Sequence, residues 1–167
     1  MHAIRRCRAN EKPAILEIIN AAAEAYRGVI PADRWHDPYM PVSQLDRDIA
    51  AGVEFWGYEL QGMLIGVMGI QRVRDVDLIR HAYVRRGSQR LGVGTALINH
   101  LRALSGRRML VGTWADAAWA IRFYEREGFV RVDAPRAAEL LETYWDIPER
   151  QIATSVVLEG ASAESCP

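Results

Sequence analysis

The stretch that decides the fold runs from Tyr83 to Leu97 and reads YVRRGSQRLGVGTAL. Its first residues continue an apolar, strand-like run, and its last residues begin a segment with apolar residues at helical spacing. Between these segments, Gly92 and Gly94 let a ligand approach the backbone closely. The free N–H groups of the first helical turn, together with the helix dipole, form an anion site suited to a pyrophosphate. The stretch therefore predicts a strand, a glycine-containing loop and a helix that bind a phosphorylated ligand.

Three kinds of phosphate-binding loop compete for this stretch. A Walker loop ends in Gly-Lys-Ser/Thr and is excluded, because the only lysine of the chain is Lys12. A dinucleotide-binding loop needs a third glycine where this chain has Leu97, and no βαβ unit with an acidic strand end follows. The remaining pattern is Q/R-x-x-G-x-G/A, here Gln89 to Gly94. Two glycines alone are equally compatible with an ordinary helix start.

A second informative segment runs from Ala120 to Phe129 and reads AIRFYEREGF. We expect a helix in which Phe123 packs inward and Tyr124 projects toward the end of the preceding strand. By itself, Phe-Tyr on a helix is compatible with ordinary core packing, and Gly128-Phe129 with an ordinary helix end. The occurrence of both segments in this order and at this spacing is much less likely by chance than the occurrence of either segment alone.

On these two segments the sequence resembles the GCN5-related N-acetyltransferase (GNAT) superfamily, over residues 3–132 and most strongly over 76–129. The resemblance implies that loop backbone amides bind the pyrophosphate of acetyl-CoA, at Gln89, Arg90, Leu91, Gly92, Val93, Gly94 and Thr95. It also implies that the preceding strand pairs its backbone, at Ala82 and Val84, with the pantetheine arm. Tyr124 is implied as the catalytic acid that protonates the departing CoA thiolate. Acetyl-CoA is the expected co-substrate, and no metal is expected.

Some positions depart from the family's pattern. Ala117 stands where the family often has an asparagine that binds the cofactor, and Arg86 stands where a proline is frequent. Leu78 and Arg80 occupy the strand positions at which several members carry a Glu or His base. The resemblance therefore leaves the general base unassigned.

A base is needed because an alkylammonium acceptor is almost wholly protonated at neutral pH. The candidates are Glu24, Glu54, Asp77 and His81. Regular alternation along a strand would place Asp77 and His81 on the face opposite Leu78 and Arg80. No local pattern decides among these four residues.

The order of elements predicts an α/β (α+β) domain with a single mixed, mostly antiparallel sheet of six to seven strands flanked by helices. Predicted strands cover 3–8, 53–60, 63–73, 76–84, 108–113, 129–132 and 152–158, and predicted helices cover 14–26, 43–51, 91–104 and 117–127. Asn10 and Asp116 are the expected caps of two of these helices. Residues 27–42 are expected to form a long loop, and 133–150 a loop with one helical turn at 137–141. The domain spans 1–159, followed by a flexible tail at 160–167.

Composition narrows the class of protein further. The chain has 167 residues, 21 basic and 21 acidic side chains, and a formal net charge of zero, which disfavours nucleic acid as a partner. The two cysteines, Cys7 and Cys166, show no metal-binding or redox spacing. The longest apolar run, Met63 to Ile70, is far shorter than the roughly 20 residues of a membrane helix. We expect a cytoplasmic protein with no membrane partner.

The acceptor side of the site is less defined by the sequence. Residues 24–40 and the Tyr144-Trp145 pair are expected to build it, with Tyr26, Trp35, Tyr39 and Trp145 as candidate wall residues. The predicted function is transfer of an acetyl group from acetyl-CoA to a primary amine of a small molecule or peptide, by direct attack in a ternary complex. The alternative is a CoA-binding sensor or interaction module with weak or no turnover. A homodimer is left open.

Overall fold

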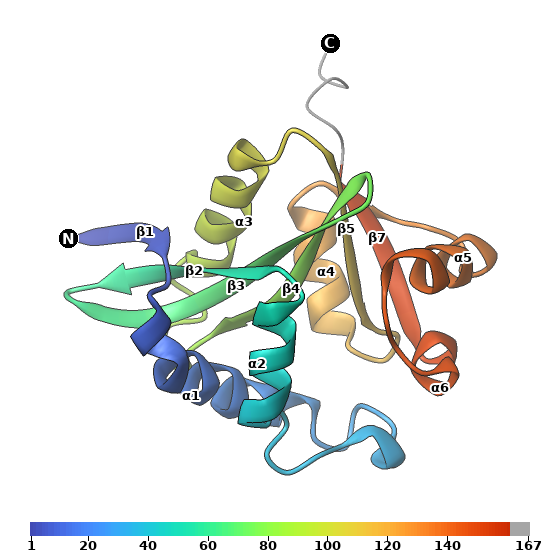
Figure 1. The fold of residues 1–167 in the computed structure, drawn as a ribbon, viewed down its shortest axis with the longest axis horizontal. Helices are drawn as coiled ribbons and strands as arrows, with labels where there is room; N and C mark the ends of the chain where they lie inside the picture. The colour runs from blue at the N-terminus through green and yellow to red at the C-terminus, as the bar shows by residue number, and fades with distance from the viewer. Residues whose placement is uncertain (161–167) are drawn as a thin grey trace.

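A computed structural model describes residues 1–160 of the chain, which form one seven-stranded sheet with helices on both faces (Figure 1). The strands are β1 (His2–Arg6), β2 (Val53–Leu60), β3 (Met63–Val73), β4 (Val76–Val84), β5 (Arg108–Trp114), β6 (Phe129–Arg131) and β7 (Ser155–Gly160). Their order in the sheet is β1-β2-β3-β4-β5-β7-β6, and the β4–β5 pair is parallel while the others are antiparallel. The predicted mixed, mostly antiparallel sheet is confirmed.

The central meander forms as the sequence predicts, with the same bounds for β2, β3 and β4. Gln61 and Gly62 close the first hairpin with positive φ values of 50° and 80°, as a two-residue hairpin turn requires. The alternating burial of β2 places Val53 and Phe55 in the core. The alternation of buried and exposed residues, together with the residues of the turn, therefore determines the structure of this half of the sheet.

The helices divide between the two faces of the sheet. On one face, α1 (Lys12–Ala22) and α2 (Val42–Ala50) pack against β2, β3 and β4, and α5 (Ala134–Tyr144) and α6 (Glu149–Ala153) cover β5 and β7. On the other face, α3 (Val93–Leu104) and α4 (Ala118–Arg126) bury the largest apolar cluster. None of the helices within residues 1–160 combines the length and apolar character that a membrane crossing requires.

The parallel pair β4 and β5 opens partway along its length (Figure 1). The two strands are paired from Val76↔Arg108 to Ile79↔Val111, yet β4 continues to Val84 and β5 to Trp114. Beyond residue 79 the side of β4 that faces β5 therefore has no strand partner. This opening positions the site described below.

Some local predictions were wrong. The segment predicted as mostly loop contains α5, an 11-residue helix, because Asp133 caps it by accepting a hydrogen bond from the Arg136 backbone N–H at 3.0 Å. Pro135 lies in its first turn, where proline is tolerated.

Two predicted helix caps were also wrong. Asn10 lies inside a short 3₁₀ helix, and Ala117 rather than Asp116 is the N-cap of α4. Gly160 is the last residue of β7, and the rest of the predicted tail, with Cys166, lies outside the described residues.

Candidate functional site

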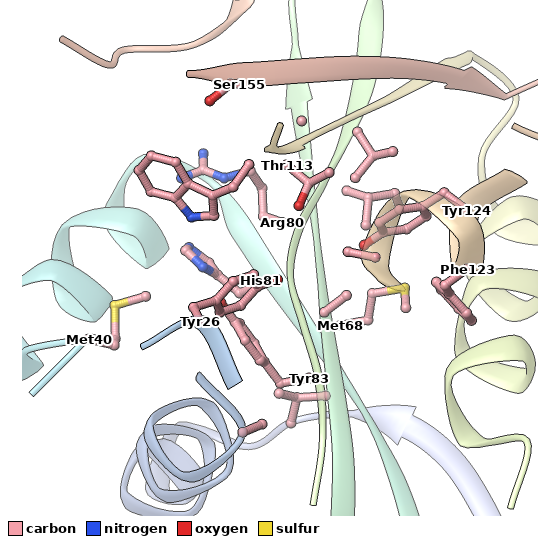
Figure 2. A pocket seen from close by; sticks show the side chains of 18 of the residues that line it. Tyr26, Met40, Met68, Arg80, His81, Tyr83, Thr113, Phe123, Tyr124 and Ser155 are labelled. Atoms are coloured by element: carbon pink, nitrogen blue, oxygen red, sulfur yellow. The ribbon is translucent and has the colours of Figure 1, made fainter. Parts of the chain in front are cut away.

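A single continuous cavity of about 1390 Å³ occupies the opening between β4 and β5 (Figure 2). Its lining comes from both faces of the sheet. One part, which we call the cofactor side, is lined by the loop after β4 and by α3 and α4. The other part, which we call the acceptor side, is lined by residues 22–40, α2 and residues 144–148. The end of β4, residues 79–84, lies between them.

The unpaired side of β4 presents backbone groups to this cavity. The Arg85 N–H donates to the Ile65 carbonyl at 2.8 Å, so residue 85 faces β3. Because backbone groups alternate along an antiparallel pair, those of Val84 face the other way, toward β5. Ala82, where the register against β3 shifts, also lines the cavity. An unpaired strand edge of this kind pairs readily with an extended amide-containing chain. The two strand residues predicted to bind pantetheine are thus placed at the opening.

The loop after β4 leads to the N-terminus of α3 at the cofactor side. Gly92 is the N-cap of α3 and has φ +74°, a left-handed conformation that favours glycine. The Ala96 N–H donates to the Gly92 carbonyl at 3.0 Å, so helical hydrogen bonding begins there. The N–H groups of residues 93–95 precede that first bond and have no partner within the helix. This helix start fits an anionic group.

The seven predicted loop residues occupy different positions. Gln89, Arg90, Gly92, Gly94 and Thr95 line the cavity, whereas the Leu91 side chain is exposed and Val93 is fully buried. Gly94 also has a packing role: a Cβ there would lie 3.1 Å from the Phe123 ring, so this glycine allows α3 to pack on α4.

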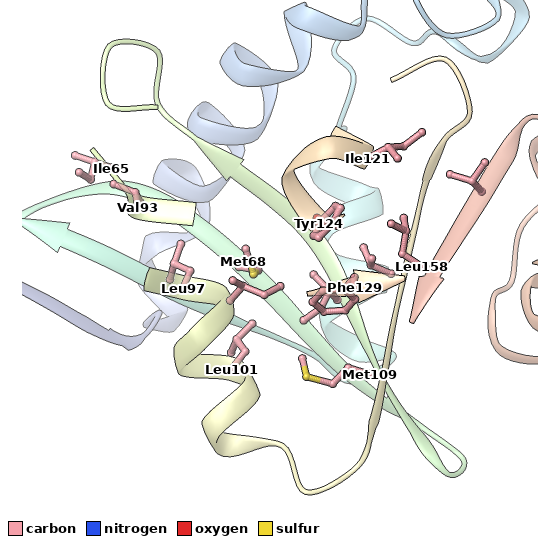
Figure 3. Packing of buried hydrophobic residues seen from close by; sticks show 14 residues of the cluster. Ile65, Met68, Val93, Leu97, Leu101, Met109, Ile121, Tyr124, Phe129 and Leu158 are labelled. Carbon is pink, nitrogen blue, oxygen red and sulfur yellow. The ribbon is translucent and has the colours of Figure 1, made fainter. Parts of the chain in front are cut away.

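Tyr124 lies on α4 at the boundary between the core and the cavity. It is 6% exposed and packs edge-on against Phe129 with ring centroids 5.8 Å apart (Figure 3). Burial raises the pKa of Tyr124 above its ordinary value, so the phenol stays protonated at neutral pH. The side chain also lines the cavity. A protonated acid at this place can donate to a leaving group, and its catalytic role remains a prediction.

A β-bulge changes the face on which two β4 side chains lie. Val67 pairs with Tyr83 and Gly69 with Arg80, so His81 and Ala82 together oppose Met68. His81 has φ +53°. Regular alternation would place Arg80 and His81 on opposite faces, and this expectation was wrong. Figure 2 shows both side chains reaching to the side where α2 lies, whereas Tyr124 lies on the other side of the strands.

Asp48 of α2 binds both of these side chains. Its Oδ2 lies 2.8 Å from His81 Nε2, and its Oδ1 lies 3.7 Å from an Arg80 guanidinium nitrogen. Burial lowers the pKa of His81, and the Arg80 charge acts in the same direction, while the Asp48 carboxylate opposes the shift. His81 is therefore neutral at pH 7 and can accept a proton. No sequence pattern indicated Asp48, because only the fold brings α2 beside β4.

The other three candidate bases lie outside the cavity lining. Asp77 is buried and accepts a hydrogen bond from Ser105 Oγ at 2.5 Å. Glu54 pairs with Arg6 at 3.0 Å, and Glu24 pairs with Arg27 at 2.8 Å. Among the four, His81 is the one that faces the cavity.

The acceptor side has an aromatic wall. Tyr26, Tyr39 and Trp145 line the cavity as expected, and so does Tyr144. Trp35 lies outside the lining and packs at a tilt against Tyr39, with ring centroids 5.5 Å apart, under the Arg27 guanidinium. The predicted loop residues thus include both wall residues and their support.

Comparison with known proteins agrees with this geometry. Residues 51–131 match the family model described as an acetyltransferase (GNAT) domain. The match covers the meander, the glycine loop, α3, α4 and β6. No curated protein sequence matches this chain.

Solved structures share the fold across nearly the whole chain. A GNAT-family acetyltransferase from Staphylococcus aureus Mu50 matches with a TM-score of 0.73 at 14% identity, over 96% of this chain and 98% of that chain. The PaiA N-acetyltransferase from Thermoplasma acidophilum, in complex with coenzyme A, matches with a TM-score of 0.72 at 14% identity and the same coverage. The ribosomal-protein-S18-alanine N-acetyltransferase from Escherichia coli matches with a TM-score of 0.67 at 17% identity, over 100% of this chain and 99% of that chain. At these identities the similarity is one of fold.

Proposed function

Residues 51–131 match a GNAT acetyltransferase domain, and on that premise we propose that this chain transfers an acetyl group from acetyl-CoA to a primary amine in a ternary complex. The observation that carries the proposal is the cavity itself. It joins an unpaired strand edge, a helix N-terminus and a protonated tyrosine on one side to a neutral histidine on the other. This arrangement supplies each group that the transfer needs.

The cofactor side fits the chemical parts of acetyl-CoA. Val84 offers backbone N–H and C=O groups to the amide-containing pantetheine arm, and the start of α3 offers free N–H groups to the pyrophosphate. Arg90 and Arg126 add positive charge to this part of the lining, against the single carboxylate of Glu127. Glu127 accepts a hydrogen bond from Thr95 Oγ1 at 2.6 Å, which fixes the Thr95 side chain in the first turn of α3. The coenzyme A in the Thermoplasma structure supports the same ligand class here.

Two side chains then move the protons of the reaction. The nitrogen of the neutral amine forms a bond to the thioester carbonyl carbon, the carbon–sulfur bond breaks, and the nitrogen releases one proton to solvent. Before this attack, the acceptor ammonium has to lose its own proton. His81 takes that proton, and Asp48, bound to its Nε2, stabilises the imidazolium that forms. Tyr124 donates its phenolic proton to the departing thiolate. The products are an N-acetylated amine and CoA.

Initial rates of thiol release from acetyl-CoA test the proposal directly, with a panel that includes alkylamines, amino acids, amino acid amides and peptides. Amine-dependent release, with the acetylated amine detected by mass spectrometry, is the expected result. CoA binding without release on any member of the panel would favour the alternative function, a CoA-binding sensor. A cytoplasmic location, the reducing compartment that suits the free Cys7 thiol, is part of the proposal.

A further inference from the structure

The acceptor side of the cavity carries an excess of positive charge. Its lining contains the guanidinium groups of Arg34, Arg47 and Arg80 against the carboxylates of Asp48 and Asp146. His81 beside them is neutral, as argued above. An acceptor that consisted only of a cationic amine would meet net repulsion here. The charge instead favours an acceptor with an anionic group of its own.

Arg80 is a partly buried member of this set and is only partly satisfied. One N–H donates to Gln71 Oε1 at 2.7 Å, and Gln71 is held in turn by its bond to the Ala51 carbonyl at 3.1 Å. The nearest carboxylate oxygen, Asp48 Oδ1, is 3.7 Å from the guanidinium, which is beyond a hydrogen bond. A guanidinium carries five N–H donors, and within residues 1–160 the others have no acceptor. The side chain keeps 21% of its surface exposed, so these donors are accessible from the cavity.

The other oxygen of Asp48 is already committed to the histidine. Asp48 Oδ2 is bound to His81 Nε2 at 2.8 Å, and the two side chains are 12% and 16% exposed. Because one carboxylate reaches both the imidazole and the guanidinium, these two groups lie within the span of one small molecule. The bulge at residues 80–82 is what turns both side chains to the same side. A proton acceptor and a guanidinium with unused N–H donors therefore lie next to each other.

We propose that the acceptor is an amino acid whose carboxylate binds Arg80 while its amine faces His81. The aromatic wall formed by Tyr26, Tyr39 and Trp145 suits an apolar side chain. This inference rests on the proposed function for its amine, but the carboxylate site is testable by binding alone.

The kinetic test compares apolar amino acids with their amides, using leucine, methionine and phenylalanine. The wild type should favour the free acid at least tenfold in kcat/KM, although the amide's less basic amine is the more reactive at neutral pH. Arg80→Gln should abolish this preference by raising KM for the acid, while kcat/KM for the amide falls much less than that for the acid. Arg80→Lys should restore part of the preference. Arg122→Gln, which removes a charge from the exposed face of α4, is the matched control and should leave the ratio unchanged.

The binding test needs no turnover. N-acetylleucine and N-acetylphenylalanine should raise the melting temperature of the CoA-bound wild type, their amides should not, and Arg80→Gln should remove the effect. Melting curves and the CoA-induced shift of each variant establish that it folds. Equal stabilisation by acid and amide, or an equal loss of both activities in Arg80→Gln, would overturn the proposal and make Arg80 a positioning residue for Asp48 and His81. Preferential acid binding without thiol release from any amine would retain the carboxylate site and refute the proposed function instead.

Discussion

The two sides of the cavity differ in how the chain builds them. The cofactor side comes from one continuous stretch, from β4 through α4, in which each element follows its neighbour along the sequence. The acceptor side combines the contiguous 27–41 loop and α2 with the bulge of β4 and the segment after α5, three regions that are far apart in the sequence. Under the proposed function, binding of acetyl-CoA is thus encoded locally, whereas selection of a particular acceptor depends on the tertiary fold. Substitutions on the two sides should accordingly differ in whether their effect depends on the acceptor.

The largest effect is expected at Tyr124, on the cofactor side. Tyr124→Phe should lower kcat by about 10²–10⁴-fold for every acceptor, because the thiolate loses its proton donor. CoA affinity should stay within a few-fold, and stability should change little because the ring keeps its packing against Phe129. Tyr58→Phe, on a ring that stacks on His2 outside the cavity lining, is the control and should leave kcat unchanged. Equal turnover in the two variants would remove Tyr124 from the mechanism.

A smaller loss is expected at His81. His81→Gln should lower kcat/KM by about 10²-fold, because the amine loses its proton acceptor. Since burial lowers the pKa of His81 below its ordinary value of 6.5, the part of the pH–rate profile due to this residue should lie below pH 6.5 and vanish in the variant. Asp48→Asn should move that part to still lower pH, because Asp48 is the group that holds the pKa of His81 up. A profile unchanged by His81→Gln would exclude His81 as the base.

The lowered pKa of His81 also makes the stability of the fold depend on pH. With a lowered folded-state pKa, His81 takes up a proton more readily in the unfolded chain. Its contribution to stability is therefore complete above about pH 6.5, the ordinary pKa, and is lost as the pH falls from there toward the folded-state pKa. Lowering the pH from 7.5 to 5.5 should reduce the melting temperature of the wild type more than that of His81→Gln. An equal loss in both proteins would contradict the buried, neutral state of this histidine.

The sequence could predict the elements whose signals are local. The β2–β4 meander, the glycine loop and α4 follow from alternation, turn residues and motif spacing. The catalytic role of Tyr124 came from the family resemblance and stays a prediction. The bulge at His81 could not be predicted, because a strand is assumed to alternate regularly. The extra residue is revealed only by the pairing of β4 with β3. Asp48 and α5 were missed for different reasons. Asp48 acts through a contact across 33 residues, and α5 has in its first turn a proline that resembles a loop signal.

The glycine loop offers a test with an internal control. Gly92 and Gly87 both have positive φ, +74° and +86°, and neither has an atom within 4 Å of a built Cβ. Alanine at either position should cost about 1 kcal/mol of stability through backbone strain. Only Gly92 lines the cavity, so only Gly92→Ala should weaken CoA binding, by about tenfold.

Thermal shift measures this difference. CoA at about a hundred times its Kd should stabilise the wild type by about 2.7 kcal/mol, which is several degrees for a domain of this size. The shift should persist in Gly87→Ala and fall by about 1.4 kcal/mol in Gly92→Ala. Equal shifts in both variants would place the pyrophosphate elsewhere.

The smallest effects are expected in the aromatic wall of the acceptor side. Tyr39→Ala should raise KM for apolar acceptors several-fold, or change which amine is used, while the CoA-induced shift stays constant. Trp35→Ala should act more weakly, because Trp35 packs against Tyr39 and lies outside the lining. Selectivity that responds to Trp145→Ala but not to Tyr39→Ala would assign the wall to the C-terminal segment.

The central claim is that both substrates meet in the opening between β4 and β5 and react there directly. Two-substrate initial-rate kinetics, with free thiol and acetylated amine measured in the same samples, tests it most directly. The account predicts intersecting double-reciprocal lines and one acetylated amine for each thiol released. Parallel lines, which indicate a covalent acetyl-enzyme, or thiol release that does not depend on the amine, would contradict it.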